Sequence, residues 1–187
     1  VTSQNGSKGL LADIICDSTI ISKTPLGTLA IGSTWDDEFE RFNIMLRNDI
    51  NGRSNIDVDG KLTPRTRSIE GTVNLDRLNI NYVQPILTDV FSEMDGSVSG
   101  QIHVDGPWNN FSISSENTRL NSSLLKVAYT NVPYYAEGLF HLDDKGVYFD
   151  DIEITDRRNG TGVVSGSIDY DHFRDIRFNT RIRVNDI

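Results

Sequence analysis

The sequence has a single cysteine, only five prolines and fewer basic than acidic residues. Cys16 has no second cysteine to pair with, which excludes an internal disulfide and a zinc site built on cysteines. The formal charge of −9, from 18 basic and 27 acidic residues, argues against a nucleic-acid binder, because the phosphate backbone rewards clustered lysine and arginine. The same charge disfavours a general attraction to anionic membrane surfaces.

Long apolar runs are also missing. The longest, GLLADIIC and STIISK, fall far short of the roughly 18 residues that a membrane-spanning helix needs. The chain starts at Val1 without a methionine or a basic and apolar leader, and we expect a soluble piece excised from a longer chain. Within it we expect one repetitive β segment over 1–187, with a weak boundary near 83–95 that separates 1–82 from 95–187.

Alternation of apolar and polar residues runs along almost the whole chain and predicts an all-β, mostly antiparallel fold. Asn-Gly, Asp-Gly and Lys-Gly pairs predict short turns, at Asn51, Asp59, Lys145 and Asn159. Helical spacing is found only in 83–94, where Pro85 can open a short helix that we expect to act as a lid. Twelve strand-like runs are predicted: 9–16, 26–35, 41–47, 55–63, 68–82, 96–104, 111–120, 123–130, 134–142, 146–154, 161–170 and 175–184.

A short motif repeats along the chain: glycine, any residue, apolar, any residue, apolar, then aspartate. It begins at Gly71, Gly100, Gly138 and Gly166, with the spacing of a small group of strands. Glycine inside a strand indicates a bend or a close backbone approach, and aspartate at the end of the motif favours a turn. The repeat predicts strand groups that stack and bury one continuous apolar face. Alternation alone leaves two architectures open, a closed sandwich and an open curved sheet.

Reactive sites are weakly supported, and we predict no enzyme, no cofactor and no metal. The residue between the motif's two apolar positions is Asn74, His103, His141 or Asp169, and we interpret these four as a solvated stripe rather than a metal ladder. Acidic clusters at 36–40 and 150–156 are typical of solvated strand edges more than of a glycosidase pair. The serines of GSVSG and GVVSG do not fit a nucleophile elbow, because they stand at the wrong position and no helix follows.

The order of motifs resembles the repeat region of the TamB (translocation and assembly module) family, within the AsmA/TamB-like bridge lipid-transfer proteins. The resemblance covers about 56–184: a segment ending in PIL…VFS, a Gly-x-x-x-Gly strand with DGP, an aromatic YAEG strand, VYFDDIEITD, and a closing strand into HFRDIRF. It implies an elongated, curved, taco-like or solenoid-like sheet with an apolar concave face. It further implies a periplasmic segment of an inner-membrane-anchored parent in a Gram-negative bacterium.

The function that the resemblance implies is outer-membrane biogenesis with an outer-membrane barrel protein as partner, in lipid transport, protein assembly or both. An apolar groove would shelter phospholipid acyl chains, and the excised fragment could pair groove to groove as a homodimer. The alternatives are a β-solenoid or sandwich module that binds a glycan or acts as an adhesin through Trp108 and the tyrosines, and a passive spacer. The predicted groove residues are Val73, Leu75, Val98, Ile102, Val104, Phe140, Leu142, Ile168, Tyr170, Ile176, Phe178, Ile182 and Val184.

Overall fold

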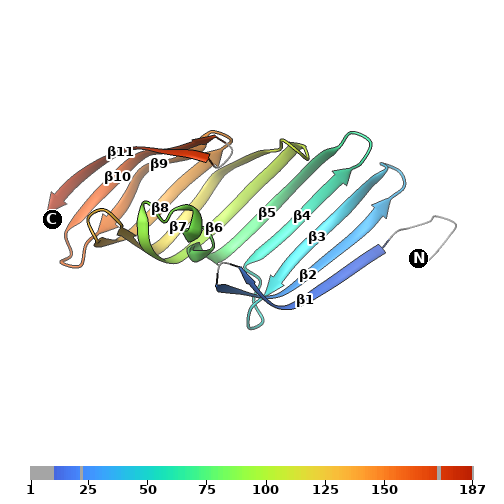
Figure 1. Ribbon diagram of the computed structural model, residues 1–187, viewed down its shortest axis with the longest axis horizontal. Helices are drawn as coiled ribbons and strands as arrows, with labels where there is room; N and C mark the ends of the chain where they lie inside the picture. The colour runs from blue at the N-terminus through green and yellow to red at the C-terminus, as the bar shows by residue number, and fades with distance from the viewer. Residues whose placement is uncertain (1–10, 22, 172–173, 187) are drawn as a thin grey trace. The chain divides into compact units, whose positions relative to one another are not determined.

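The computed structural model describes residues 11–21, 23–171 and 174–186, and they form one antiparallel sheet of eleven strands (Figure 1). Each strand is hydrogen-bonded to the next along the chain, and the sheet is not closed. The predicted all-β, antiparallel fold is therefore confirmed. The strands are β1 (Leu11–Ile21), β2 (Thr24–Asp36), β3 (Arg41–Asp49), β4 (Ile56–Thr63), β5 (Ser68–Asn79), β6 (Phe91–Pro107), β7 (Ser112–Val127), β8 (Val132–Asp143), β9 (Gly146–Thr155), β10 (Thr161–Asp171) and β11 (Arg174–Asp186).

The chain divides into two compact units. The first contains 1–76 and 101–113, so it holds β1 to β4, most of β5 and the end of β6. The second contains 77–100 and 114–187, which includes the start of β6, almost all of β7 and all of β8 to β11. The boundary predicted near 83–95 stays a prediction. Across the described residues, no helix is long and apolar enough to cross a membrane.

Short hairpins in regular register connect β2 to β5 in the first unit. The β3–β4 turn has Asn51 and Gly52 at φ of 55° and 80°, the pair of positive angles that a type I′ turn requires. Across this hairpin Phe42 lies opposite Leu62, and Leu46 lies opposite Val58. The turn predicted at Asp59-Gly60 is wrong, because both residues lie inside β4, where Gly60 pairs directly with Gly71 of β5.

One buried amide holds the β3–β4 end of the first unit together. Asn48 is 1% exposed, and its Nδ2 donates to the Leu26 carbonyl at 3.0 Å. Its Oδ1 accepts from the backbone N–H groups of Asn55 and Ile56, both at 2.8 Å. A buried amide with three backbone partners supplies hydrogen bonds that the β3–β4 ladder does not make at this point.

We expect Asn48→Ala to lower the free energy of unfolding of the first unit by about 3 kcal/mol, because it leaves one carbonyl and two N–H groups without partners. Urea unfolding followed by tryptophan fluorescence measures this loss, since both tryptophans, Trp35 and Trp108, lie in the first unit. The control is Asn43→Ala on the same strand, with an expected change within about 0.5 kcal/mol. Equal losses for the two variants would contradict the role given to Asn48.

Extra residues interrupt alternate strands of the second unit. Arg77, Ser122 and Asp151 lie in β5, β7 and β9 with φ of 48°, 38° and 53°. Serines of the neighbouring strands bond two of these positions: the N–H of Arg77 donates to Ser99 Oγ at 3.0 Å, and that of Asp151 donates to Ser165 Oγ, also at 3.0 Å. Such bulges raise the local twist and bend a strand.

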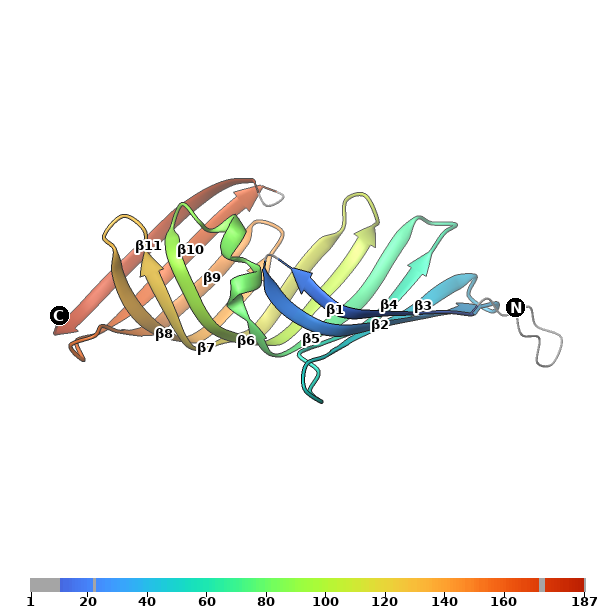
Figure 2. The same ribbon diagram turned by 60° about the horizontal axis from the view of Figure 1, so that its bottom comes forward.

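The repeat glycines stand where strands approach each other closely. Gly138 has a φ of 158°, and a Cβ at this residue would lie 2.7 Å from Ile152 Cδ1. Added Cβ atoms at Gly71 and Gly100 would also come within 3.0 Å of the neighbouring strand. Bulges and glycine kinks together curve a sheet, and the strands of the second unit bend along their length (Figure 2).

The short helix predicted in 83–94 is wrong in form. The structure has two 3₁₀ turns, η1 (Ile80–Tyr82) and η2 (Gln84–Ile86), and residues from Phe91 onward already belong to β6. Pro85 stands in the first turn of η2, as expected. A single helical turn fixes several dihedral angles for one hydrogen bond, so it does not extend into a longer helix without more residues that favour helix. Ile80 is buried at 5% exposure.

Few side chains are fully buried, because the described strands form a single layer. Among the side chains that the structure describes, the buried apolar ones are Leu26, Ile80, Met94, Ala136, Ile152 and Ile154. A closed sandwich would cover one face of every strand with a second sheet, whereas all of these strands belong to the same sheet. The open alternative is therefore the one that the chain adopts.

Candidate functional site

One face of the first unit is apolar across four strands. The register aligns Ile31, Leu46, Val58 and Val73 in one row from β2 to β5. A second row contains Trp35, Phe42, Leu62 and Ile69. Every side chain in these two rows is half-buried and none is fully buried. The rows therefore form a continuous apolar face that no second layer covers within the described residues.

The opposite face of the first unit is polar and charged. Ion pairs join neighbouring strands, between Arg47 and Asp57 and between Lys61 and Glu70. Gln101 Nε2 donates to Asn74 Oδ1 at 2.8 Å, which places Gln101 on this polar face. Because residues alternate along a strand, Ile102 lies on the apolar face.

The second unit repeats this division between an apolar and a polar face. Leu142, Val147, Ile168 and Phe178 form one row from β8 to β11. A cluster of Ala136, Ile152 and Ile154 lies on the same face, in contact with Leu120, Leu125, Tyr134, Phe149 and Val164.

Side chains of the apolar face cover one another in the second unit. Ala136 is only 2% exposed although its strand belongs to a single layer. It is covered by side chains of the same face, which pack around Ala136, Ile152 and Ile154. On the other face Arg119 pairs with Glu137, and Arg183 pairs with Asp151 at 2.7 Å.

The predicted groove residues fall on the apolar faces. Val73, Leu75, Ile102 and Val104 lie on that of the first unit. The second unit carries Val98, Phe140, Leu142, Ile168, Phe178, Ile182 and Val184. The side chain of Ile176 lies outside the described part of the chain. Whether any of these residues faces a lipid stays a prediction.

Tyr170 is tied to the turn between β8 and β9. Its hydroxyl donates to the carbonyl oxygen of Asp143 at 2.7 Å. Burial, followed by the carboxylates of Asp143 and Asp144, raises the pKa of the Tyr170 phenol to about 12. The group therefore stays protonated at neutral pH and serves as a hydrogen-bond donor to the backbone.

The motif-based prediction missed the apolar residues of β2, β3 and β4. Ile31, Leu46 and Val58 lie in the same row as the predicted Val73, yet the repeat motif that selected Val73 does not occur in their strands. Simple alternation in LGTLAIGSTW and RFNIMLR carried the missing signal.

The stripe of possible metal ligands forms ordinary polar contacts. Asn74 is bonded to Gln101, and His103 Nδ1 lies 3.4 Å from Thr72 Oγ1. His141 stacks on Tyr148 with ring centroids 5.1 Å apart. Among the residues that the structure describes, no three histidine, cysteine or acidic side chains are grouped in a way that could hold a metal ion.

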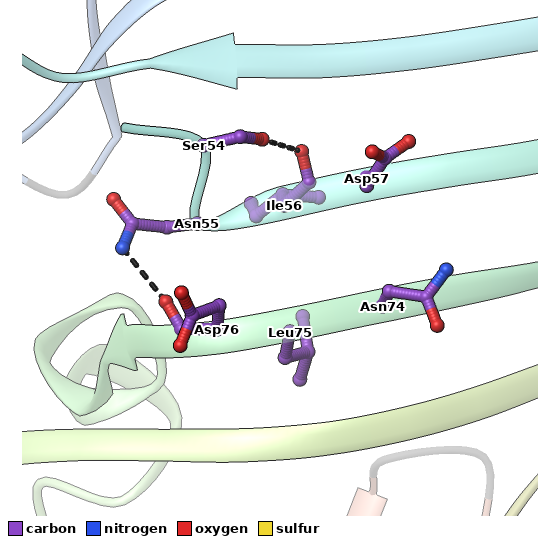
Figure 3. Close-up of a pocket in the computed structure, with 7 residues that line it drawn as sticks. All are labelled: Ser54, Asn55, Ile56, Asp57, Asn74, Leu75 and Asp76. Carbon is purple, nitrogen blue, oxygen red and sulfur yellow. Dashed lines mark hydrogen bonds between the residues drawn. The ribbon is translucent and has the colours of Figure 1, made fainter. Parts of the chain in front are cut away.

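A shallow hollow of ≈ 230 Å³ lies where β4 begins and β5 ends, lined by residues of 54–57 and 74–76 (Figure 3). Asn55 Nδ2 donates to the Asp76 carbonyl at 2.7 Å, and Ser54 Oγ donates to the Ile56 carbonyl at 2.9 Å. The polar groups of the lining therefore bond to one another. The hollow is the place where the start of β4 is hydrogen-bonded to the end of β5.

The broad apolar faces, rather than any pocket, are therefore the candidate functional surface. No protein-family model matches this chain, and no characterised protein or solved structure was found to be similar to it.

Proposed function

We propose that the apolar faces shelter phospholipid acyl chains, and that the chain is a non-enzymatic segment of a TamB-like periplasmic protein. In this proposal the parent is anchored in the inner membrane of a Gram-negative bacterium and works with an outer-membrane barrel protein. Its task is outer-membrane biogenesis, through lipid transport between membranes, assistance to protein assembly, or both. The resemblance of the 56–184 motifs to that family supports the cellular setting.

One observation carries the proposal: apolar rows cross four strands without a polar interruption and without a covering layer. In the row of Ile31, Leu46, Val58 and Val73, every side chain is half-buried. Soluble proteins rarely leave contiguous apolar areas of this kind uncovered unless something binds there. A hydrocarbon chain matches such a surface, because it needs apolar contact and no hydrogen-bond partners.

The energy of such binding suits transport. Strands in a sheet are spaced about 4.8 Å apart, so a row across four strands spans roughly 14 Å. Each methylene group withdrawn from water contributes ~0.8 kcal/mol, and a chain lying on one face loses about half of its contact with water. Ten methylenes would then contribute about 4 kcal/mol. That is enough to hold a chain briefly without fixing it at one place.

Photo-crosslinking tests the proposal. A photoreactive residue is placed at Ile102 or, separately, at Gln101, and the chain is produced in the periplasm of a Gram-negative host. After irradiation, attached phospholipid is scored by mass spectrometry. We expect lipid on position 102 and little on position 101, because the Gln101–Asn74 hydrogen bond places these neighbours on opposite faces.

Both positions lie on one strand of the first unit, so each serves as the control for the other in folding and location. Equal lipid at the two positions would indicate nonspecific contact with membranes. No lipid at either position in a folded periplasmic protein would overturn the proposal and favour a binding module or a spacer.

A further inference from the structure

Three turns on the same side of the first unit carry exposed aromatic side chains. Neighbouring strands are antiparallel, so every second turn lies on this side (Figure 1). We name these turns the aromatic edge: 37–40 between β2 and β3, 64–67 between β4 and β5, and 108–111 between β6 and β7. Phe39 is 55% exposed, Trp108 44% and Phe111 45%. Arg41 covers only part of Phe39, with its Cζ 4.4 Å from the ring centroid.

The phenylalanine and tryptophan residues of the first unit are concentrated at this edge. They are Trp35, Phe39, Phe42, Trp108 and Phe111. Trp35 and Phe42 form the second strand pair from the first turn, with their ring centroids 4.8 Å apart, and the other three lie in the turns. The turn at the other end of β3 and β4, residues 50–55, contains no aromatic residue. Turns favour small and polar residues, so this one-sided placement calls for a partner at the aromatic edge.

Contacts between the turns hold the aromatic edge together. The Trp108 N–H donates to the Arg67 carbonyl at 2.9 Å, which joins the third turn to the second. Arg65 Nη1 lies 3.7 Å from Glu40 Oε2, which brings the second turn close to the first. A surface that is already arranged loses less conformational entropy when it binds.

Charged side chains of both signs lie between the aromatic rings. The exposed ones include Arg65, Arg67, Asp37 and Glu38. A phosphatidylethanolamine or phosphatidylcholine headgroup has a phosphate and an amine, so both signs find an opposite charge. A strongly anionic surface would instead repel the carboxylates, as it would the whole chain with its charge of −9.

We propose that the aromatic edge anchors the first unit to the surface of a bilayer of zwitterionic phospholipids. Aromatic rings favour the headgroup level of a membrane, where an apolar ring and a polar rim both find partners. Neighbouring turns are two strands apart, about 10 Å. A bilayer accepts side chains at any spacing, whereas a protein partner needs a pocket for each ring. Anchoring does not require acyl chains on the apolar face, so the two proposals can fail separately.

Vesicle flotation of the 187-residue chain tests the proposal, with vesicles of phosphatidylethanolamine and phosphatidylcholine. We expect the wild type to float with them. The variant Phe39→Ser/Trp108→Ser/Phe111→Ser is expected to bind at least about tenfold more weakly, because it removes the apolar area that enters the interface. The control Val83→Ser/Tyr129→Ser/Val132→Ser replaces three exposed residues of the second unit and is expected to bind as the wild type does.

The position of Trp108 gives a second readout. In Trp35→Phe it is the one remaining tryptophan. We expect its fluorescence emission to shift to shorter wavelength when vesicles are added, because the ring moves from water to the interface. An emission that does not shift while the protein floats would show that another surface binds the vesicles.

Two measurements separate anchoring from folding and from acyl-chain binding. Trp35 remains in the triple variant of the aromatic edge, and its fluorescence in urea reports whether the first unit is folded. Capture of a short-chain photoreactive phospholipid that is dispersed as monomers is expected to be equal in this variant and in the wild type. Ile102→Asp is expected to float as the wild type does, although it captures less lipid.

Several results would overturn the proposal. A wild type that does not float, or a folded triple variant of the aromatic edge that floats equally well, would do so. An equal loss in the control would mean that any exposed apolar residue serves. Flotation that requires phosphatidylglycerol in the vesicles would exclude a zwitterionic surface, and loss of self-association instead of flotation would assign the aromatic edge to a second copy of the chain.

Discussion

Replacing Gly166 with valine is expected to detach β11 from the sheet and to destabilise the second unit by more than about 3 kcal/mol. Gly166 has a φ of 146°, which side-chain-bearing residues rarely adopt. A Cβ built on it would lie 2.0 Å from the carbonyl oxygen of Asn179 on β11. Both the backbone angle and the contact must change, so the β10–β11 pairing around Ser167 and Asn179 is lost.

Hydrogen exchange of the backbone amides of β9 to β11 measures this effect. We expect protection to fall in these strands, while the first unit, which contains both tryptophans, keeps its fluorescence and urea midpoint. Ser167→Val is the matched control, because the neighbouring residue has no positive φ, and its expected change is within about 1 kcal/mol. Wild-type protection in Gly166→Val would show that the kink is dispensable.

The second large effect concerns the apolar face of the first unit. We expect Ile102→Asp to reduce capture of a photoreactive fatty-acyl phospholipid at least about tenfold, because a carboxylate placed among hydrocarbon loses its hydration. Gln101→Asp places the same charge one residue away on the polar face, where Gln101 is exposed, and is expected to capture as much lipid as the wild type. Labelled lipid bound per protein is the measured quantity.

Stability must be measured in parallel with capture, because Ile102 is half-buried. Tryptophan fluorescence in urea reports whether Ile102→Asp remains folded at the assay temperature. A folded Ile102→Asp that captures lipid as the wild type does would contradict a role for this face. An equal loss in both variants would mean that added negative charge, rather than its position, repels the lipid.

Most strand positions could be predicted from alternation alone, because a single-layer sheet with one apolar face obeys a period of two everywhere. The exceptions are local. The runs 111–120 and 123–130 form one strand, β7, since Ser122 enters a bulge where NSS resembles a turn. Asp59-Gly60 resembles a hairpin turn but continues β4, because both residues pair with β3 on one side and with Thr72 and Gly71 of β5 on the other.

The apolar face could be predicted, but not whether another layer covers it. Val73 alternates with Asn74 in the same way in a sandwich and in an open sheet. A sandwich and an open sheet differ in which strands pair with each other. The residue pattern of any single strand does not reveal its pairing partners. Alternation marks Ile31, Leu46 and Val58 as apolar-face residues, but only the register shows that they share one row with Val73.

The strictly sequential strand order has a consequence for how such a chain can change in length. Every strand in the described sheet pairs with its chain neighbour, so each hairpin forms from local contacts and needs no distant segment to be in place first. Deleting or duplicating one hairpin would leave the pairing rules of all the others unchanged. Gene duplication could therefore lengthen this sheet in steps of two strands, with the apolar face kept in phase at every step.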